Sequence, residues 1–259
     1  MCVLAFAWRA HPRWRLILAG NRDELHARPA APLHRWPEAP GVIAGQDLES
    51  GGTWLGVSLA GRMAVITNHR SAGRRKLDPP SRGLLVRDLL TGTGAYAWPQ
   101  VEDLAAFNPF QLITVADGAA ALWSNAGSAP TRQTLGTGLY GLSNGTLDEP
   151  WPKTVRLKAL TADWLAGPAD DLEPLFAALA DEARPADAAL PATGLGTERE
   201  RLHSAIFIRD PDYGTRCSTV VAVDANGAGR IVERRFGADG ARTGETALAF
   251  KWAAEIASP

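Results

Sequence analysis

Short apolar runs joined by tight turns occupy both ends of this chain, and they restrict the folds that it can form. Cys2–Trp8 and Leu16–Asn21 are separated by a turn rich in Arg, His and Pro, and Trp54–Leu59 and Met63–Thr67 flank Ala60-Gly61. Short runs bounded by turn residues are typical of β-hairpins. Hairpin connections favour antiparallel sheets over a parallel, doubly wound sheet.

Further strands are expected in the second half of the chain. Asp117-Gly118 separates Phe110–Ala116 from Ala119–Ser124, as in a two-residue hairpin turn. Four later apolar runs also predict strands. They are Ser204–Ile208, Ser218–Val223, Ile231–Phe236 and Thr246–Trp252.

Three segments carry helical signals. A short helix is expected over Leu84–Leu90, with Ser81 as its N-cap. Apolar residues at helical spacing predict a longer helix over Pro152–Leu165. A third helix is expected over Asp170–Asp181, before a loop rich in Pro, Ala and Gly. This order of elements predicts an α+β fold in which helices cover the outer faces of antiparallel sheets.

Composition and charge exclude several classes of protein. A net charge of −1 gives no basic field that would attract nucleic acid or an anionic membrane surface. No run approaches the roughly 18 apolar residues of a membrane span. The two cysteines, Cys2 and Cys217, cannot form a disulfide framework, so we expect a cytoplasmic protein. No repeat or long linker divides the chain, which predicts one domain over residues 1–259.

The sequence carries no motif for a cofactor or a metal. The five histidines show no His-x-x-x-His spacing, and no Cys-x-x-Cys pair is present. Gly51-Gly52 precedes a strand and not a helix, which is unlike a phosphate-binding loop. We therefore predict neither a cofactor nor a bound metal.

Cys2 directly follows the initiator methionine. Methionine aminopeptidase generally removes Met1 when a small residue follows, which would leave a thiol and an α-amine on one residue. The amine has an ordinary pKa of about 7.7–8.0 and can act as a base for the thiol. A free cysteine is more often a small buried hydrophobe, so that alternative stays open for Cys2 and is the expectation for Cys217.

Polar residues end several of the expected strands. In Asn21–Glu24, Asp23 can hold the α-amine of Cys2 and Arg22 can favour the thiolate. Neighbouring strand residues face opposite sides of a sheet, so these two side chains share a site only if the chain bends or bulges. Asn68 and Asn144 each follow a strand, where an amide N–H can stabilise an oxyanion, although turn formation is the alternative.

Three further residues are candidates for the same site. Arg216 precedes a strand and can supply a cation near the thiol, although a solvent-facing side chain is the alternative. Trp54 follows the Gly-Gly turn and is expected in the wall of a substrate pocket. His69 adjoins Asn68 as a haem ligand or an acid–base group, with an exposed hairpin histidine as the alternative.

Taken together, six motifs resemble the NRDE family, also called the transport and Golgi organisation protein two family. The motifs are Cys2, Asn21–Glu24, Gly51–Gly56, Thr67-Asn68, Gly141–Asn144 and Gly214–Thr219. That family is in turn similar to the N-terminal nucleophile hydrolases, especially the penicillin V acylase and bile salt hydrolase branch. The resemblance implies a four-layer αββα sandwich of two antiparallel sheets flanked by helices.

The resemblance also implies residue roles. Cys2 matches the nucleophile and Asp23 the aspartate that orients the amine. Asn68 and Asn144 match the asparagines around the oxyanion and the substrate carbonyl.

One position departs from the acylase pattern. That pattern has an arginine three residues before the aspartate, where this chain has Gly20. The cation would then come from Arg22 or Arg216, with Arg209 as a third source.

Two functions follow as hypotheses. In the first, the Cys2 thiolate attacks an amide or thioester of a small acyl substrate and the α-amine relays the proton. In the second, the protein is a non-catalytic carrier that binds haem or an acyl-CoA. The motif set suits acyl transfer better than haem binding, which favours the hydrolase.

Overall fold

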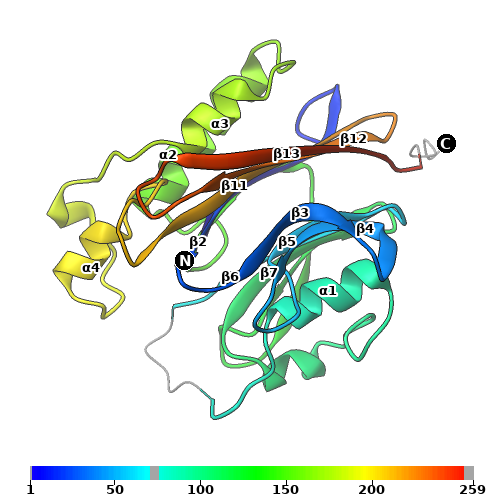
Figure 1. Cartoon of the computed structure of the whole chain (residues 1–259), viewed down its shortest axis with the longest axis horizontal. Helices are drawn as coiled ribbons and strands as arrows, with labels where there is room; N and C mark the ends of the chain where they lie inside the picture. The colour runs from blue at the N-terminus through cyan, green and yellow to red at the C-terminus, as the bar shows by residue number, and fades with distance from the viewer. Residues whose placement is uncertain (1, 71–75, 254–259) are drawn as a thin grey trace.

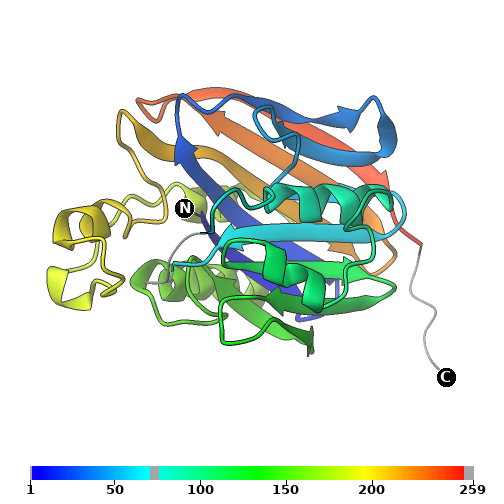
Figure 2. The same cartoon turned by 90° about the horizontal axis from the view of Figure 1, so that it is seen from below.

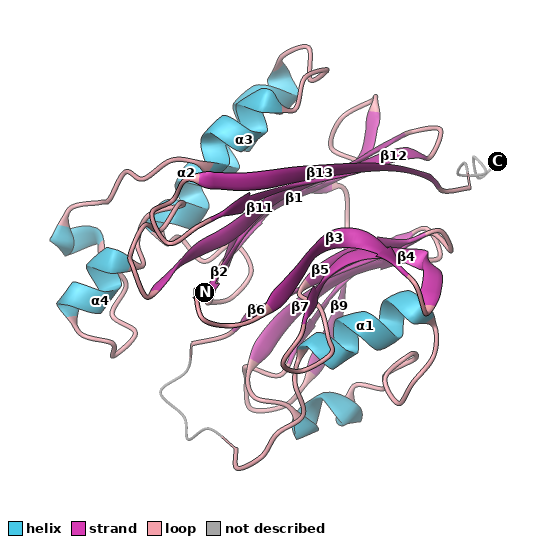
Figure 3. Ribbon diagram, viewed as in Figure 1, coloured by secondary structure: helices cyan, strands magenta, loops and turns pink. Residues whose placement is uncertain are grey.

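Two antiparallel sheets stack face to face between two layers of helices (Figures 1 and 3). The computed structural model describes residues 2–70 and 76–253. Sheet A has the order β10-β1-β2-β11-β12-β13, and sheet B has the order β3-β4-β5-β6-β7-β8-β9. This arrangement confirms the predicted four-layer αββα sandwich.

Sheet A combines strands from both ends of the chain. It contains β1 (Cys2–Trp8), β2 (Trp14–Leu25), β10 (Gly138–Leu142), β11 (Tyr213–Asp224), β12 (Ala228–Phe236) and β13 (Arg242–Lys251). Sheet B is a continuous meander. It contains β3 (Ala30–Trp36), β4 (Ala39–Asp47), β5 (Leu55–Ser58), β6 (Arg62–Asn68), β7 (Phe110–Ala116), β8 (Ala119–Ser124) and β9 (Thr131–Leu135).

The helices cover the outer faces of the two sheets. Seen from below, α1 lies across the outer face of sheet B (Figure 2), while α2 and α3 pack on sheet A. The helical segments are α1 (Gly83–Thr91), α2 (Pro152–Ala166), α3 (Glu173–Leu179), α4 (Thr197–Leu202) and the 3₁₀ turns Glu102–Ala106 and Asp187–Ala189. Within the described residues, no helix has the length and apolar character needed to cross a bilayer.

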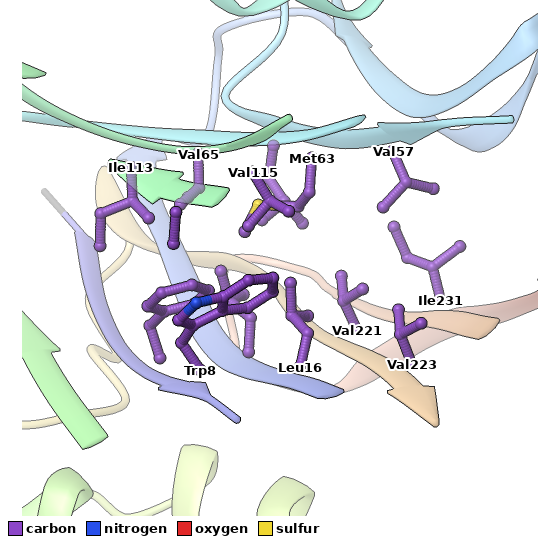
Figure 4. Close-up of a cluster of buried hydrophobic side chains, with 14 of the residues drawn as sticks. Trp8, Leu16, Val57, Met63, Val65, Ile113, Val115, Val221, Val223 and Ile231 are labelled. Atoms are coloured by element: carbon purple, nitrogen blue, oxygen red, sulfur yellow. The ribbon is translucent and has the colours of Figure 1, made fainter. Parts of the chain in front are cut away.

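The largest apolar core lies between the two sheets (Figure 4). Trp8 and Leu16 of sheet A face Val65 and Met63 of sheet B. Along β1 the even-numbered residues from Leu4 join this core, while the odd-numbered residues pack under α2 and α3. The continuous apolar run at the start of the sequence thus reflects a strand that is buried on both faces.

The hairpins around Ala60-Gly61 and Asp117-Gly118 are confirmed. The predicted helices are confirmed as α1, α2 and a shorter α3. Ser81 is not an N-cap, because α1 begins after Arg82 and no side chain caps it.

The strand predicted over Ser204–Ile208 is wrong. The segment is buried, but its backbone does not join a sheet. The N–H of Phe207 donates to the carbonyl of Asp181, and the N–H of Ile208 donates to Oγ1 of Thr215. A short apolar run signals burial, and here the burial is that of a loop.

Gly52 allows two backbone segments to meet next to the inter-sheet space. A Cβ at this position would lie 2.4 Å from the carbonyl carbon of Gly83, at the start of α1. The N–H of Thr53 also donates to the Gly83 carbonyl, at 3.2 Å. Only glycine permits so close an approach, which holds Thr53 and Trp54 in place.

Candidate functional site

A cavity of about 420 Å³ lies between the sheets at one end of the sandwich. It is bounded by the start of β1, the end of β2, the ends of β4 and β6, and the segment before α1. The first residue of β1, Cys2, lies at this end of the sandwich. The site residues among those that line it are Cys2, Arg22, Asp23, Trp54, Asn68 and Arg216.

Cys2 is the first residue of β1 and is 8% exposed. It lies on the same face of the strand as Leu4, so its thiol is directed into the inter-sheet space. Its backbone N–H donates to Oδ1 of Asn144 at 3.3 Å, and its carbonyl accepts from Oγ of Ser143 at 2.8 Å. Met1 and its predicted removal lie outside the described residues.

Asn144 is fully buried, and both the oxygen and the nitrogen of its side-chain amide form hydrogen bonds. Its Oδ1 accepts from the N–H of Cys2, and its Nδ2 donates to the carbonyl of Asn68 at 2.8 Å. The Asn144 side chain is therefore directed at the nitrogen of Cys2 and not into the cavity. The exposed Asn68 lines the cavity instead.

The four residues Asn21–Glu24 divide between the two faces of sheet A. Arg22 pairs with Cys2 across β1 and β2, so both side chains lie on the inter-sheet face. There Arg22 reaches Asp47 of sheet B, at 3.4 Å. Asn21 and Asp23 direct their side chains to the helix-covered face, as strand alternation requires, although Asp23 also borders the cavity at the end of β2.

Asp23 is 2% exposed and is held by residues of the Gly214–Thr219 motif. Thr215 donates from Oγ1 to Oδ1 of Asp23 at 2.8 Å. The register between β2 and β11 shifts by one residue after Thr215, which places Arg216 in a β-bulge. Arg216 donates to the carbonyls of Leu25 and Arg28 at the rim of the cavity, at 2.8 and 3.0 Å.

Burial dominates the electrostatics of the site. Burial raises the pKa of the Cys2 thiol, and the negative charge of Asp23 raises it further. The positive charge of Arg22 lowers it. Burial also raises the pKa of the Asp23 carboxyl, against the charge of Lys153 and the hydrogen bond from Thr215. The thiol needs a base beside it or a nearby cation to react at neutral pH.

Sequence reasoning missed Lys153, a buried cation on α2 whose charge reaches both Asp23 and Cys2. The spacing of Lys153 from the apolar residues of the helix could have identified it in the sequence. Lys153 lies four residues before Leu157 and eleven before Trp164, on the face of α2 that packs against sheet A. A lysine in the apolar stripe of an amphipathic helix is a candidate for a buried functional group.

Gly20 cannot be replaced by a larger residue without rearrangement. A Cβ there would lie 2.9 Å from the Cβ of Leu4 and 3.2 Å from the Val3 carbonyl. The arginine that the acylase pattern has at this position therefore does not fit here. Arg209 is exposed, binds Glu182 and is not among the residues that line the cavity.

The remaining candidates differ in their relation to the cavity. Trp54 lines it and packs against the inter-sheet core. His69 is not among the lining residues, and burial lowers the pKa of its imidazole. Cys217 also lines the cavity, where burial and the nearby Glu233 raise the pKa of its thiol.

No group of three or more His, Cys, Asp or Glu side chains in the described chain is arranged to hold a metal ion.

Asn21 stabilises the fold around the site. Its Nδ2 donates to the carbonyls of Leu179 and Ile206, and its Oδ1 accepts from Ser218. Asn21→Ala would leave these buried groups unpaired, so we expect a loss of about 2–3 kcal/mol in the free energy of unfolding. Urea denaturation measures this loss, with Asn226→Ala in an exposed turn as the control. Equal stability of the two variants would contradict the assigned role.

His203 should make the fold sensitive to acid. Burial and the charge of Arg70 lower the pKa of His203 to about 3, whereas an unfolded histidine titrates near about 6.5. As the pH falls from about 6.5 towards 3, the unfolded state takes up a proton that the folded state does not, so stability declines. His203→Gln should lose less stability than wild type between pH 7 and 4.5. Parallel pH profiles in urea denaturation would contradict this prediction.

Comparison with known proteins identifies relatives of this chain. The sequence profile described as Transport and Golgi organisation 2 matches residues 1–238. The Bos taurus Transport and Golgi organization protein 2 homolog is 36% identical over 97% of this chain and 99% of its own length. The Homo sapiens homolog is 31% identical over 90% of this chain and 92% of its own length.

A solved structure establishes the wider similarity of the fold. The Caenorhabditis elegans ortholog of N-acylethanolamine-hydrolyzing acid amidase superposes with a TM-score of 0.50, at 13% identity. The superposition covers 85% of this chain and 92% of the amidase. This similarity shows that the chain and the amidase share a fold.

Proposed function

The chain belongs to the Transport and Golgi organisation 2 family, and we propose that it is a hydrolase whose nucleophile is the N-terminal Cys2. It cleaves an amide or thioester bond of a small acyl substrate after Met1 has been removed. The position of Cys2 carries the proposal: the thiol faces the cavity, while the backbone nitrogen is bonded to Asn144. Removal of Met1 would convert that nitrogen into an α-amine next to the thiol.

The reaction proceeds by acyl transfer to sulfur. The thiol proton passes to the α-amine as Sγ of Cys2 bonds to the substrate carbonyl carbon. The protonated amine then gives its proton to the leaving nitrogen or sulfur as the substrate bond breaks. A water molecule, deprotonated by the same amine, hydrolyses the thioester and releases the acid.

Each residue next to Cys2 has a separate role in the proposed reaction. Asn68 lines the cavity and is the donor proposed for the oxyanion. Asn144 orients the α-amine through its Oδ1. Asp23, buried and bonded to Thr215, balances the charge of the amine when it is protonated. Arg22 lies opposite Cys2 in the register and favours the thiolate.

The substrate is a small molecule with polar as well as apolar parts. A cavity of about 420 Å³ is within the usual range for small-molecule sites. Its lining combines the indole of Trp54 with arginine and carboxylate side chains. An acyl chain against Trp54 and a polar leaving group near Arg216 would match this lining.

Peptide-mapped mass spectrometry after limited treatment with iodoacetamide tests the proposal. We expect Met1 to be absent and Cys2 to be alkylated faster than both Cys217 and a free peptide thiol. The peptide thiol is needed as a reference because both cysteines are buried, so a difference between their rates does not by itself show an activated thiol. Retention of Met1 would contradict the mechanism, and a processed Cys2 of ordinary reactivity would favour a non-catalytic carrier of haem or acyl-CoA.

A further inference from the structure

Lys153 is a buried lysine that lies outside the lining of the proposed substrate cavity. It lies in the first turn of α2 and is 4% exposed, and its Nζ has no hydrogen-bond partner within the described part of the chain. Removing an ammonium group from water costs several kcal/mol unless other charges compensate. A lysine held in this way is a candidate for a functional role.

The carboxylates near Lys153 point to what compensates its charge. Burial lowers the pKa of the Lys153 ammonium group. The negative charges of Asp23 on β2 and Glu200 on α4 raise it and favour the charged form. Glu200 is already paired with Arg70, at 2.8 Å. Asp23 has the larger effect of the two on Lys153, and it lies on the face of sheet A on which α2 packs.

A second cavity, which shares no lining residue with the proposed substrate site, adjoins Lys153. It measures about 10 Å³, enough for about one water molecule, and His203 lines it together with Arg70 and Glu200. Nδ1 of His203 is also buried without a hydrogen bond among the described residues. His203 is neutral near pH 7, since burial and Arg70 lower its pKa to about 3. The charged groups with the largest effects on Lys153 are Asp23, Arg70 and Glu200, and the thiol of Cys2 also acts on it.

We propose that Lys153 is a positioning residue for the nucleophile, because its ammonium group offsets the charge of Asp23 at Cys2. The inference rests on the proposed function. A carboxylate alone favours the protonated amine and disfavours the thiolate, and both effects slow the reaction. A cation on the other side of that carboxylate reverses both effects. Lys153 thereby keeps the α-amine free to accept the thiol proton near pH 7.

The pH profile of Cys2 alkylation tests this role without a substrate. In the Met1-processed protein, Lys153→Met should raise the midpoint of the profile by about 1 pH unit. Near pH 7, the rate of Cys2 alkylation should therefore be about tenfold lower than in wild type. Lys153→Arg keeps the charge and should restore the midpoint towards the wild-type value. Lys158→Met is the matched control, because Lys158 lies on the same helix, is partly exposed and binds Asp148. Its profile should coincide with that of wild type.

The outcomes separate the inference from the proposed function. A wild-type profile for Lys153→Met, with wild-type Cys2 still faster than a peptide thiol, would overturn the role of Lys153 alone. A wild-type Cys2 no faster than the peptide thiol would overturn the proposed function and the inference together. Circular dichroism establishes folding of each variant, and Lys153→Gln serves as a second neutral variant if Lys153→Met does not fold.

Discussion

Cys2→Ala is expected to lower the rate of substrate hydrolysis by about a thousandfold or more, to the background level. The substitution removes the atom that bonds to the acyl group, and loss of a nucleophile typically has an effect of this size. Alanine fits the space of the cysteine, so the fold and the cavity should persist. Hydrolysis of thioester and amide substrates, compared under saturating conditions, measures the loss.

Two further variants distinguish a lost nucleophile from a disturbed site. Cys2→Ser keeps an oxygen nucleophile with a much higher pKa, and its rate should lie between those of wild type and Cys2→Ala. Cys217→Ala removes the chain's other cysteine and should lower the rate far less than Cys2→Ala. Wild-type turnover in Cys2→Ala would show that the hydrolysis does not use this thiol.

Gly52→Ala is expected to lower the free energy of unfolding by at least about 2 kcal/mol. The added Cβ would lie 2.4 Å from the backbone of Gly83, and neither backbone is a flexible side-chain end that can move aside. The loop that carries Thr53 and Trp54 would have to separate from the start of α1. Urea denaturation with an unchanged m-value gives the loss directly.

Gly41→Ala is the matched control for Gly52→Ala. Gly41 lies in β4, and a Cβ there would meet no heavy atom within 4 Å. Its substitution should change stability by less than about 1 kcal/mol, through the entropy of the unfolded chain. Equal stability of the two variants would contradict the close backbone approach at Gly52.

The architecture was predictable because the signals for its main elements are local. The β1–β2 hairpin follows from two apolar runs and a turn, and α2 follows from apolar residues at helical spacing. β3 and β4 were not predicted. Pro32 and a register shift interrupt the pairing of β3 with β4, so neither strand has a continuous apolar pattern.

The details of the site depend on contacts between distant segments, which no local pattern encodes. Strand alternation correctly separates Arg22 from Asp23, but only the register shows that Arg22 lies opposite Cys2. The bulge at Arg216 and the hydrogen bond from Thr215 to Asp23 form where β11 pairs with β2. Thr215 and Asp23 are about 190 residues apart in the sequence. The charge of Lys153 acts on Asp23 only because α2 packs on sheet A.

The most direct test of the account is the mass of the protein after brief reaction with an activated acyl ester. We predict that the Met1-processed protein gains one acyl group, and that peptide mapping locates this group on Cys2. The adduct should disappear with time in buffer as water releases the acid, and it should not form in Cys2→Ala. An acyl group found on another residue, or an unmodified Cys2 in protein that lacks Met1, would contradict the claim that Cys2 is the nucleophile.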